Sequence, residues 1–348
     1  MAMAEGKQDL QSSGIAKLDV HLKGESLWAS AWKRMLHNRL AIMGLVIILI
    51  AILVAVFADT IALKPYFETD LRNGDSAPYW VTQVFTSMVP VEDGGYIKIN
   101  NDYPLGADNL GRDIFSRIVY GTRISLLVAF AGPVFALGVG LIVGLASGYF
   151  GGALDNVLMR VVDIMYAFPT LLFIILLMTF FRFSTATPEP GSFTFTLGQL
   201  DKSTGGMLFI FIGIGFTSWM QMARLVRGQV LSAREEEYVV SARAMGANTP
   251  RIMWRHILPN ILGPLIVAET LTIPQYISYE AFLSFIGLGV QVPTPSWGSM
   301  ISDGSRAISS YPNQAIFPAL ALFFVMFAFN FLGDGLRDAL DPRMRGVG

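Results

Sequence analysis

Six long apolar runs divide this chain of 348 residues, and each is close to the length that crosses a lipid bilayer. About 20 predominantly apolar residues in helical conformation span the hydrocarbon core. In lipid, every backbone polar group must be paired within the protein, so such segments form helices. The runs cover residues 40–58, 124–148, 157–181, 207–226, 262–287 and 316–332. The sequence therefore predicts an all-α membrane protein with six transmembrane helices.

Composition agrees with a membrane protein and excludes several classes of function. Charged residues make up 15% of the chain, whereas soluble domains are usually near a quarter charged. The net charge of −1 and the lack of a basic block argue against a nucleic-acid partner. The chain has no cysteine, and its three histidines lack metal-ligand spacing, so we predict neither a disulfide nor a metal site. No G-x-x-x-x-G-K-[ST] phosphate loop occurs, which places any ATP hydrolysis on another chain.

Positive charge beside the apolar runs predicts the orientation, because Lys and Arg near the ends of spans favour the cytoplasm. The rule places both termini inside. We expect a cytoplasmic segment (1–38), a first span that stays as an uncleaved anchor (39–58), an extracytoplasmic segment (59–122), a five-span core (123–334) and a cytoplasmic tail (335–348). The cations that carry this prediction are Lys33, Arg34, Arg39, Arg227, Arg234, Arg337, Arg343 and Arg345.

One group of cations disagrees with this orientation. Arg112, Arg117 and Arg123 lie just before the second span, on its predicted outer side. In the same stretch, "DNLGRDIFSRIVYG" places apolar side chains on one face of a short helix. This helix is expected to lie along the membrane surface or, more simply, to pack on the tops of other helices.

A polar segment between the fourth and fifth runs, residues 229–261, carries the signals of a helix, a turn and a second helix; we call it the polar hairpin. Acidic residues 235–237 suit the start of a helix. Tyr238, Ala242 and Met245 then recur as one apolar stripe. Gly246 fits the left-handed end of that helix. Periodicity alone allows either docking on another protein or contact with lipid headgroups.

The second helix of the polar hairpin also has a start signal. Asn248 or Thr249 can cap it, with Pro250 at its first position. The helix is expected to run through Arg251 toward Pro259 at the start of the fifth span.

Three acids lie within apolar runs, where ionisable residues are costly and often functional. Asp163, Glu269 and Glu280 could form the ion relay of a secondary transporter. Alternatively, they pair with Arg160 or with polar groups at helix junctions. Small residues in the second run are expected to allow close helix packing: Gly132, Gly138, Gly140 and Gly144.

The stretch "SARAMGANTPRIMWRHILP" (241–259) resembles the cytoplasmic coupling loop of ABC importer permeases. That loop has the pattern E-A-A, three residues, Gly, nine residues, Ile, one residue, Leu-Pro. Here Gly246, Leu258 and Pro259 keep the spacing, while Val240 and His256 replace the pattern's Glu and Ile. Ser241-Ala242 stand in for the paired alanines, and Glu237 resembles the acid of the peptide-transport branch.

Further stretches narrow the resemblance to the C-type permease subunit of oligopeptide/dipeptide ABC importers. They include "WKRMLHNRLAIMG", "YPLGADNLGRDIFSRIVYGTRISLLVA", "GYFGG", "VDIMYAFPTLL", "EAFLSFIGLGVQVPTPSWGSM" and "LGDGLRDALDPR", in that order. The resemblance implies a type I permease fold that lines half of a pathway for short peptides, without catalytic activity. It also implies that the hairpin docks on an ATPase subunit through Glu237, Tyr238, Ser241, Ala242, Arg243, Ala244, Gly246, Ala247, Arg251, Leu258 and Pro259.

The implied partners are a paralogous permease, two ABC ATPase subunits that bind ATP and Mg, and an extracytoplasmic substrate-binding protein. The implied location is the bacterial inner membrane. Asp163, Glu269 and Glu280 then become candidates for pathway or gate support. Three alternatives remain open: an ion-coupled carrier, a non-transporting membrane anchor, and a permease of the same family for nickel, glutathione or oligosaccharides.

Overall fold

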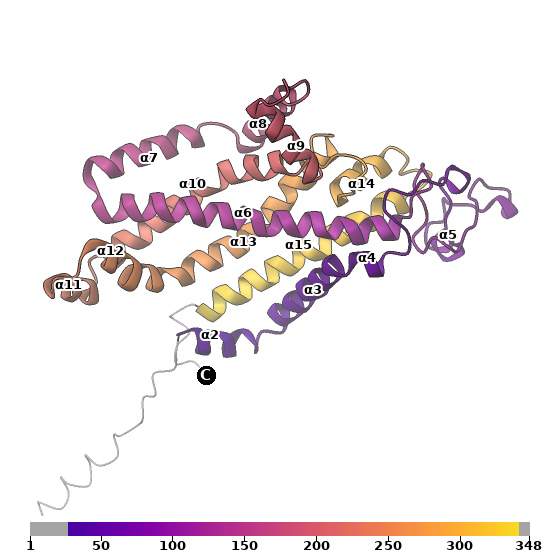
Figure 1. The fold of residues 1–348 in the computed structure, drawn as a ribbon. Coiled ribbons are helices and arrows are strands. Elements are labelled where there is room, and N and C mark those ends of the chain that lie inside the picture. The colour runs from indigo at the N-terminus through magenta and orange to yellow at the C-terminus, as the bar shows by residue number, and fades with distance from the viewer. Residues whose placement is uncertain (1–26, 341–348) are drawn as a thin grey trace, which may run out of the picture.

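The protein is described by a computed structural model, in which residues 27–340 are placed. The expected terminal segments therefore lie partly outside the described residues, Arg343 and Arg345 among them. Long helices run side by side and form an elongated bundle (Figure 1). Within the described residues, five helices are long and apolar enough to cross a membrane, and a bent helix pair could form a sixth span.

The five continuous spans agree in place with five of the apolar runs, but most extend further. They are α3 (Arg39–Val56), α6 (Ile114–Phe150), α10 (Leu208–Ala233), α13 (Leu258–Phe285) and α15 (Asn313–Leu340). Shorter helices connect and cover them: α2 (Leu27–Met35), α4 (Ala58–Ile61), α5 (Tyr79–Val84), α9 (Phe193–Ser203), α11 (Glu237–Ala244), α12 (Thr249–Arg251) and α14 (Trp297–Ser305). Two 3-10 turns, η1 (Leu71–Asn73) and η2 (Val91–Asp93), and one π-helical turn, η3 (Ile252–Ile257), lie between these helices.

The third apolar run is not one straight span, so the prediction of a continuous helix over 157–181 is wrong. It is divided into α7 (Gly152–Tyr166) and α8 (Thr170–Ser184), which meet at an angle of 84°. The break coincides with Pro169, which is extended at φ −60° and ψ 120°. A proline also disfavours helical geometry at the residue before it. Hydropathy does not register such a break, since most residues on both sides of it are apolar.

Glycines bring α6 and α10 into close contact. A Cβ atom added at Gly144 would lie 2.5 Å from Cβ of Val226, and one added at Gly140 would lie 2.7 Å from Cβ of Met222. Gly132 similarly gives room to Tyr276 of α13. The predicted packing role is confirmed at these three glycines. It is wrong at Gly138, where nothing lies within 4 Å of an added Cβ.

The helix expected just before the second span is not a separate element. Its location along the membrane surface is wrong, whereas the alternative of packing on other helices agrees with the burial of Ile114 and Val119. Ile114 is the first residue of α6 itself. Asp113 caps the helix by accepting a hydrogen bond from the backbone N–H of Ser116 at 2.8 Å. Because a carboxylate cap satisfies the free donors of a helix end, α6 begins well outside the apolar run.

Candidate coupling site and polar sites along the bundle

The turn of the polar hairpin has the geometry that its sequence predicts. Gly246 adopts φ +83°. The backbone N–H of Ala247 reaches back to the carbonyl of Ala242 at 3.0 Å, which closes the end of α11. Asn248 Oδ1 then accepts a hydrogen bond from the N–H of Arg251 at 3.1 Å, and caps α12.

The buried face of α11 differs from the predicted apolar stripe. Val239 and Ala242 are buried, and Val239 packs with Ile252 in the core cluster at this end of the bundle. Tyr238 and Met245 instead point outward, with 39% and 81% of their surface exposed. Only one face of the 8-residue helix α11 packs against the bundle, so the apolar side chains on its other face are exposed.

Most of the residues that the family pattern singles out lie on the outer surface of the hairpin. The exposed ones are Glu237, Tyr238, Ser241, Arg243, Ala244, Gly246, Arg251 and Pro259; Ala247 and Leu258 are half-buried and Ala242 is buried. The hairpin thus presents side chains that residues 27–340 leave uncovered.

The hairpin continues into the fifth span without interruption. The π-helical turn η3 joins α12 to α13, and Thr249–Phe285 form one helical segment of 37 residues. Leu258 and Pro259 are the first residues of α13, and Pro259 has no N–H to donate to the helical turn before it, where the π turn η3 lies. Extra residues in a π turn relieve the backbone locally and frequently occur at functional sites.

The sequence does not predict an ion pair that lies at the base of the hairpin. Arg227 of α10 donates two hydrogen bonds, each 2.6 Å long, to the two carboxylate oxygens of Asp155 in α7. Ser147 of α6 also donates to Asp155. Three spans therefore meet at one carboxylate. The Asp that follows the "GYFGG" stretch was a signal for it, but its partner lies 72 positions away.

The three acids in the spans have separate partners and do not meet one another. Asp163 accepts from Arg224 of α10 at 2.5 Å, so the predicted pairing with Arg160 is wrong. Glu269 is buried and accepts a hydrogen bond from the Tyr276 hydroxyl at 3.2 Å. Within residues 27–340, no three His, Asp or Glu side chains lie together in an arrangement that could hold a metal ion.

Glu280 fastens the end of α13 to the loop that follows it. It is fully buried, and its Oε1 accepts a hydrogen bond from Ser284 at 2.7 Å. The same Ser284 hydroxyl accepts the backbone N–H of Val290 at 3.4 Å. The expected pairing of this acid with polar groups at a helix junction agrees with these contacts.

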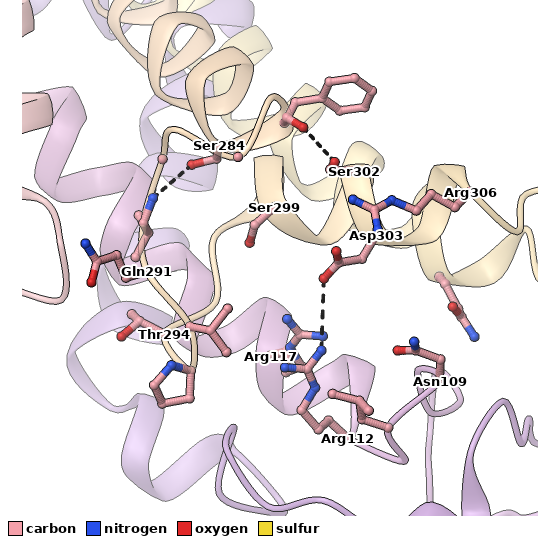
Figure 2. A pocket seen from close by; sticks show the side chains of 18 of the residues that line it. Asn109, Arg112, Arg117, Ser284, Gln291, Thr294, Ser299, Ser302, Asp303 and Arg306 are labelled. Atoms are coloured by element: carbon pink, nitrogen blue, oxygen red, sulfur yellow. Dashed lines mark hydrogen bonds and ion pairs between the residues drawn. The ribbon is translucent and has the colours of Figure 1, made fainter. Parts of the chain in front are cut away.

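A cavity of about 840 Å³ lies at the opposite end of the bundle from the hairpin. Its lining includes four arginines, two of which are Arg112 and Arg117. Both bind the carboxylate of Asp108, Arg112 with Nε at 2.7 Å. Figure 2 shows their guanidinium groups together, with Asp303 and Arg306 of α14 on the facing side.

Comparison with known proteins agrees with the fold. Residues 138–346 match the family model of the binding-protein-dependent transport system inner membrane component. Residues 26–78 match the N-terminal TM domain of oligopeptide transport permease C.

Named relatives span nearly the whole chain. The oligopeptide transport system permease protein OppC of Bacillus subtilis is 41% identical, over 93% of this chain and 92% of its own. OppC of Escherichia coli K12 is 40% identical over 99% and 100%. The glutathione transport system permease protein GsiD of Pectobacterium atrosepticum is 35% identical over 91% and 92%.

A structure of the MetNI methionine ABC transporter in an inward-facing conformation shares the fold. It has a TM-score of 0.50 at 20% identity, and the match covers 66% of this chain and 98% of that one. The importer family works with separate ATPase subunits, so an ion-coupled carrier and a non-transporting anchor are both set aside. The chain belongs to the binding-protein-dependent inner-membrane component family, in its oligopeptide and dipeptide permease C branch, and is a non-catalytic, integral inner-membrane subunit of an ABC importer.

Proposed function

We propose that this chain forms half of an inner-membrane pathway for short peptides, with a paralogous permease as the other half. Relatives named as oligopeptide permeases are 40–41% identical over almost the whole chain, which supports peptides as the substrate class. In this proposal two ATPase subunits bind ATP and Mg on the cytoplasmic side. A binding protein delivers the peptide on the other side.

The observation that carries the proposal is the exposed surface of the polar hairpin. Tyr238 and Met245 project from a short helix whose turn leads directly into α13. An exposed helix with apolar anchors suits a cleft on another protein. We infer that an ATPase subunit covers this surface, and that its closure moves α13 through the hairpin.

The arrangement of the bundle supports cytoplasmic termini. The hairpin, α2 and the last turn of α15 lie toward one end of the bundle, whereas α5 and α14 lie at the other (Figure 1). The outer arginines that disagreed with this orientation are paired with acids of the same chain. Arg117 binds Asp108, and Arg123 binds Asp59 at 2.8 Å. Long loops are translocated largely regardless of their charge, so these arginines carry little weight in the orientation rule.

The arginine-lined cavity supports a role for the outer face. It lies between the 59–122 segment, which supplies Arg112, and the 291–315 segment, which supplies Asp303. In this proposal the binding protein delivers the peptide to the surface formed by these two segments. Glu280 and Ser284 hold the loop at the cavity's edge, which suits the expected role of Glu280 in gate support.

Replacing Gly246 with Val tests the hairpin. A β-branched residue resists a positive φ, and nothing lies within 4 Å of an added Cβ at Gly246, so the substitution acts through the backbone alone. We expect at least a fivefold loss of ATP-driven uptake or of ATPase co-purification. The left-handed backbone conformation costs a residue with a Cβ about 1–2 kcal/mol, which corresponds to a loss of this size.

Gly94→Val is a matched control for this experiment. Gly94 has φ +80° and equally open surroundings, but it lies in the extracytoplasmic segment. The control should leave ATPase co-purification from detergent unchanged. If the Gly246 variant keeps both assembly and transport, the hairpin is not the coupling element.

Uptake into proteoliposomes tests the substrate class. The complete complex with its binding protein should take up labelled trialanine when ATP is present and an uncoupler has abolished the ion gradient. Glutathione, an oligosaccharide and nickel ions serve as competing substrates. Uptake of one of these without uptake of trialanine would contradict the peptide assignment.

A further inference from the structure

Two adjoining cavities beside the break in the third span combine polar and apolar walls. The polar one, about 140 Å³, is lined by hydroxyl and amide side chains of α7, α8, α10 and α13, among them Tyr166, Gln221, Gln275 and Tyr279. The apolar one, about 240 Å³, is lined mainly by aromatic and aliphatic side chains of α7, α8 and α10, including Phe173 and Phe216. Thr170, Thr217 and Met220 belong to both walls, so the two cavities are direct neighbours.

The polar wall cannot face lipid without cost. Gln221, Arg224 and Gln275 are exposed in this chain, although each lies within a membrane-spanning helix. Polar and ionisable side chains in spans face the bundle interior or a water-filled cavity, because hydrocarbon offers them no partner. This face of α10 and α13 is therefore turned toward the pathway.

The break between α7 and α8 points to the same conclusion. Pro169, at the start of α8, provides no side-chain cap for the free N–H groups of the first turn. Irregular backbone at membrane depth is tolerated where it lines a cavity or is buried in protein. The ion pair of Arg224 with Asp163 and the contact of Arg224 with the Tyr166 ring, at 4.2 Å, hold the end of α7 against α10 beside the cavities.

We propose that these cavities form a peptide subsite within the pathway; the inference rests on the proposed function. The polar cavity takes main-chain groups. Amide and phenol side chains such as Gln275 and Tyr279, which already bond each other at 2.6 Å, can both donate to and accept from a peptide bond. The apolar cavity takes one uncharged side chain, stacked beside Phe173 and Phe216, whose rings lie parallel at 5.4 Å.

The chemistry of the two walls predicts what the subsite selects. Main-chain hydrogen bonds are common to all peptides, so the polar wall gives affinity without sequence preference. The apolar wall offers no partner to a charged group, and burial of an unpaired charge is strongly unfavourable. The subsite therefore prefers an apolar side chain at one position of the peptide.

Uptake of two tripeptides, Ala-Phe-Ala and Ala-Ala-Ala, by the complete complex in proteoliposomes tests the apolar wall. Phe216→Trp narrows the cavity and should lower uptake of Ala-Phe-Ala relative to Ala-Ala-Ala by about tenfold, a size typical of steric discrimination in apolar pockets. Phe180→Trp is the matched control, since Phe180 is exposed on α8 and lines neither cavity. It should leave the ratio unchanged.

Gln275→Leu tests the polar wall. It should lower uptake of both tripeptides by about fivefold, the effect of one hydrogen bond, and leave their ratio unchanged. A merely structural role would instead lower the thermal stability of the complex together with uptake.

Photocrosslinking gives an independent readout. A tripeptide with benzoylphenylalanine in the middle should label α8 or α10 near Phe173 or Phe216 in the wild-type complex, and excess Ala-Phe-Ala should suppress the label. Labelling of the paralogous permease alone, or an unchanged uptake ratio in Phe216→Trp, would overturn the subsite while peptide import stands. Failure of the wild type to import either tripeptide would overturn the proposed function and the subsite together.

Discussion

At the scale of single residues, the N-terminal end of α6 depends on one carboxylate that serves two buried cations. Arg112 and Arg117 both bind Asp108, and all three side chains are at most 7% exposed. Removing one partner of a buried charge group leaves the others without compensation. This costs far more than the pair contributes relative to apolar residues. Asp108 is therefore expected to be essential for the outer segment to fold.

Asp108→Asn should destabilise the protein by about 3–5 kcal/mol, because two guanidinium groups lose their shared anion. Thermal unfolding of the purified complex measures the effect. Asp303→Asn is the control: Asp303 is 48% exposed and lies 4.0 Å from Arg112, so its loss should cost less than about 1 kcal/mol. Equal losses in the two variants would contradict the assignment.

A second carboxylate gives a pH dependence with a defined sign. Hydrogen bonds from Arg123 and Tyr120 hold the pKa of Asp59 below its ordinary value of 3.8. A lowered pKa in the folded state stabilises the fold above the unfolded value, and this contribution is lost as the pH falls through the folded value. The difference in Tm between wild type and Asp59→Asn should thus be constant above about pH 5 and shrink toward pH 3. Arg123→Gln should weaken the same trend, because it removes the larger of the two causes and leaves the hydrogen bond from Tyr120.

At the scale of helices, some elements follow from the sequence and others do not. Apolar length alone predicts the five spans that are continuous helices. The preference of glycine for a positive φ predicts the bend at Gly246. Both signals depend only on neighbouring residues. The break at Pro169 lies within a mostly apolar run, and the partner of Asp163 lies 61 positions away on α10. Helix ends are also misplaced, since a cap such as Asp113 extends α6 beyond its apolar part. Hydropathy carries no information on these non-local or capping contacts.

The contact between α6 and α10 gives a test at this scale. Gly144→Ala places a methyl group 2.5 Å from Cβ of Val226, so the helices must separate. Such overpacking should cost about 1–3 kcal/mol. Gly138→Ala adds the same methyl group to the same helix in open space, and should leave the Tm unchanged or raise it, because Ala favours helix over Gly. Equal stabilities would exclude the proposed packing role of Gly144.

At the scale of the whole molecule, the direction of the bundle in the membrane is the main prediction. The chain contains no cysteine, so single cysteines can report which side of the membrane is accessible. Asp338 is exposed near the end of α15, and Val91 is exposed in the segment predicted to be extracytoplasmic. In right-side-out vesicles, an impermeant maleimide should label Val91→Cys directly and Asp338→Cys only after permeabilisation. The reverse pattern would invert the topology.

The unbroken path from α12 through η3 to the end of α13 has a further consequence. At 1.5 Å per residue, its 37 residues form a rod about 55 Å long. Tilting such a rod by about 5° around one end carries the other end roughly 5 Å sideways. Pro264 and Pro274 interrupt the backbone bonding along it and mark where a pivot would form most easily. The position of that pivot along the segment then determines how far each of its two ends moves for a given tilt angle.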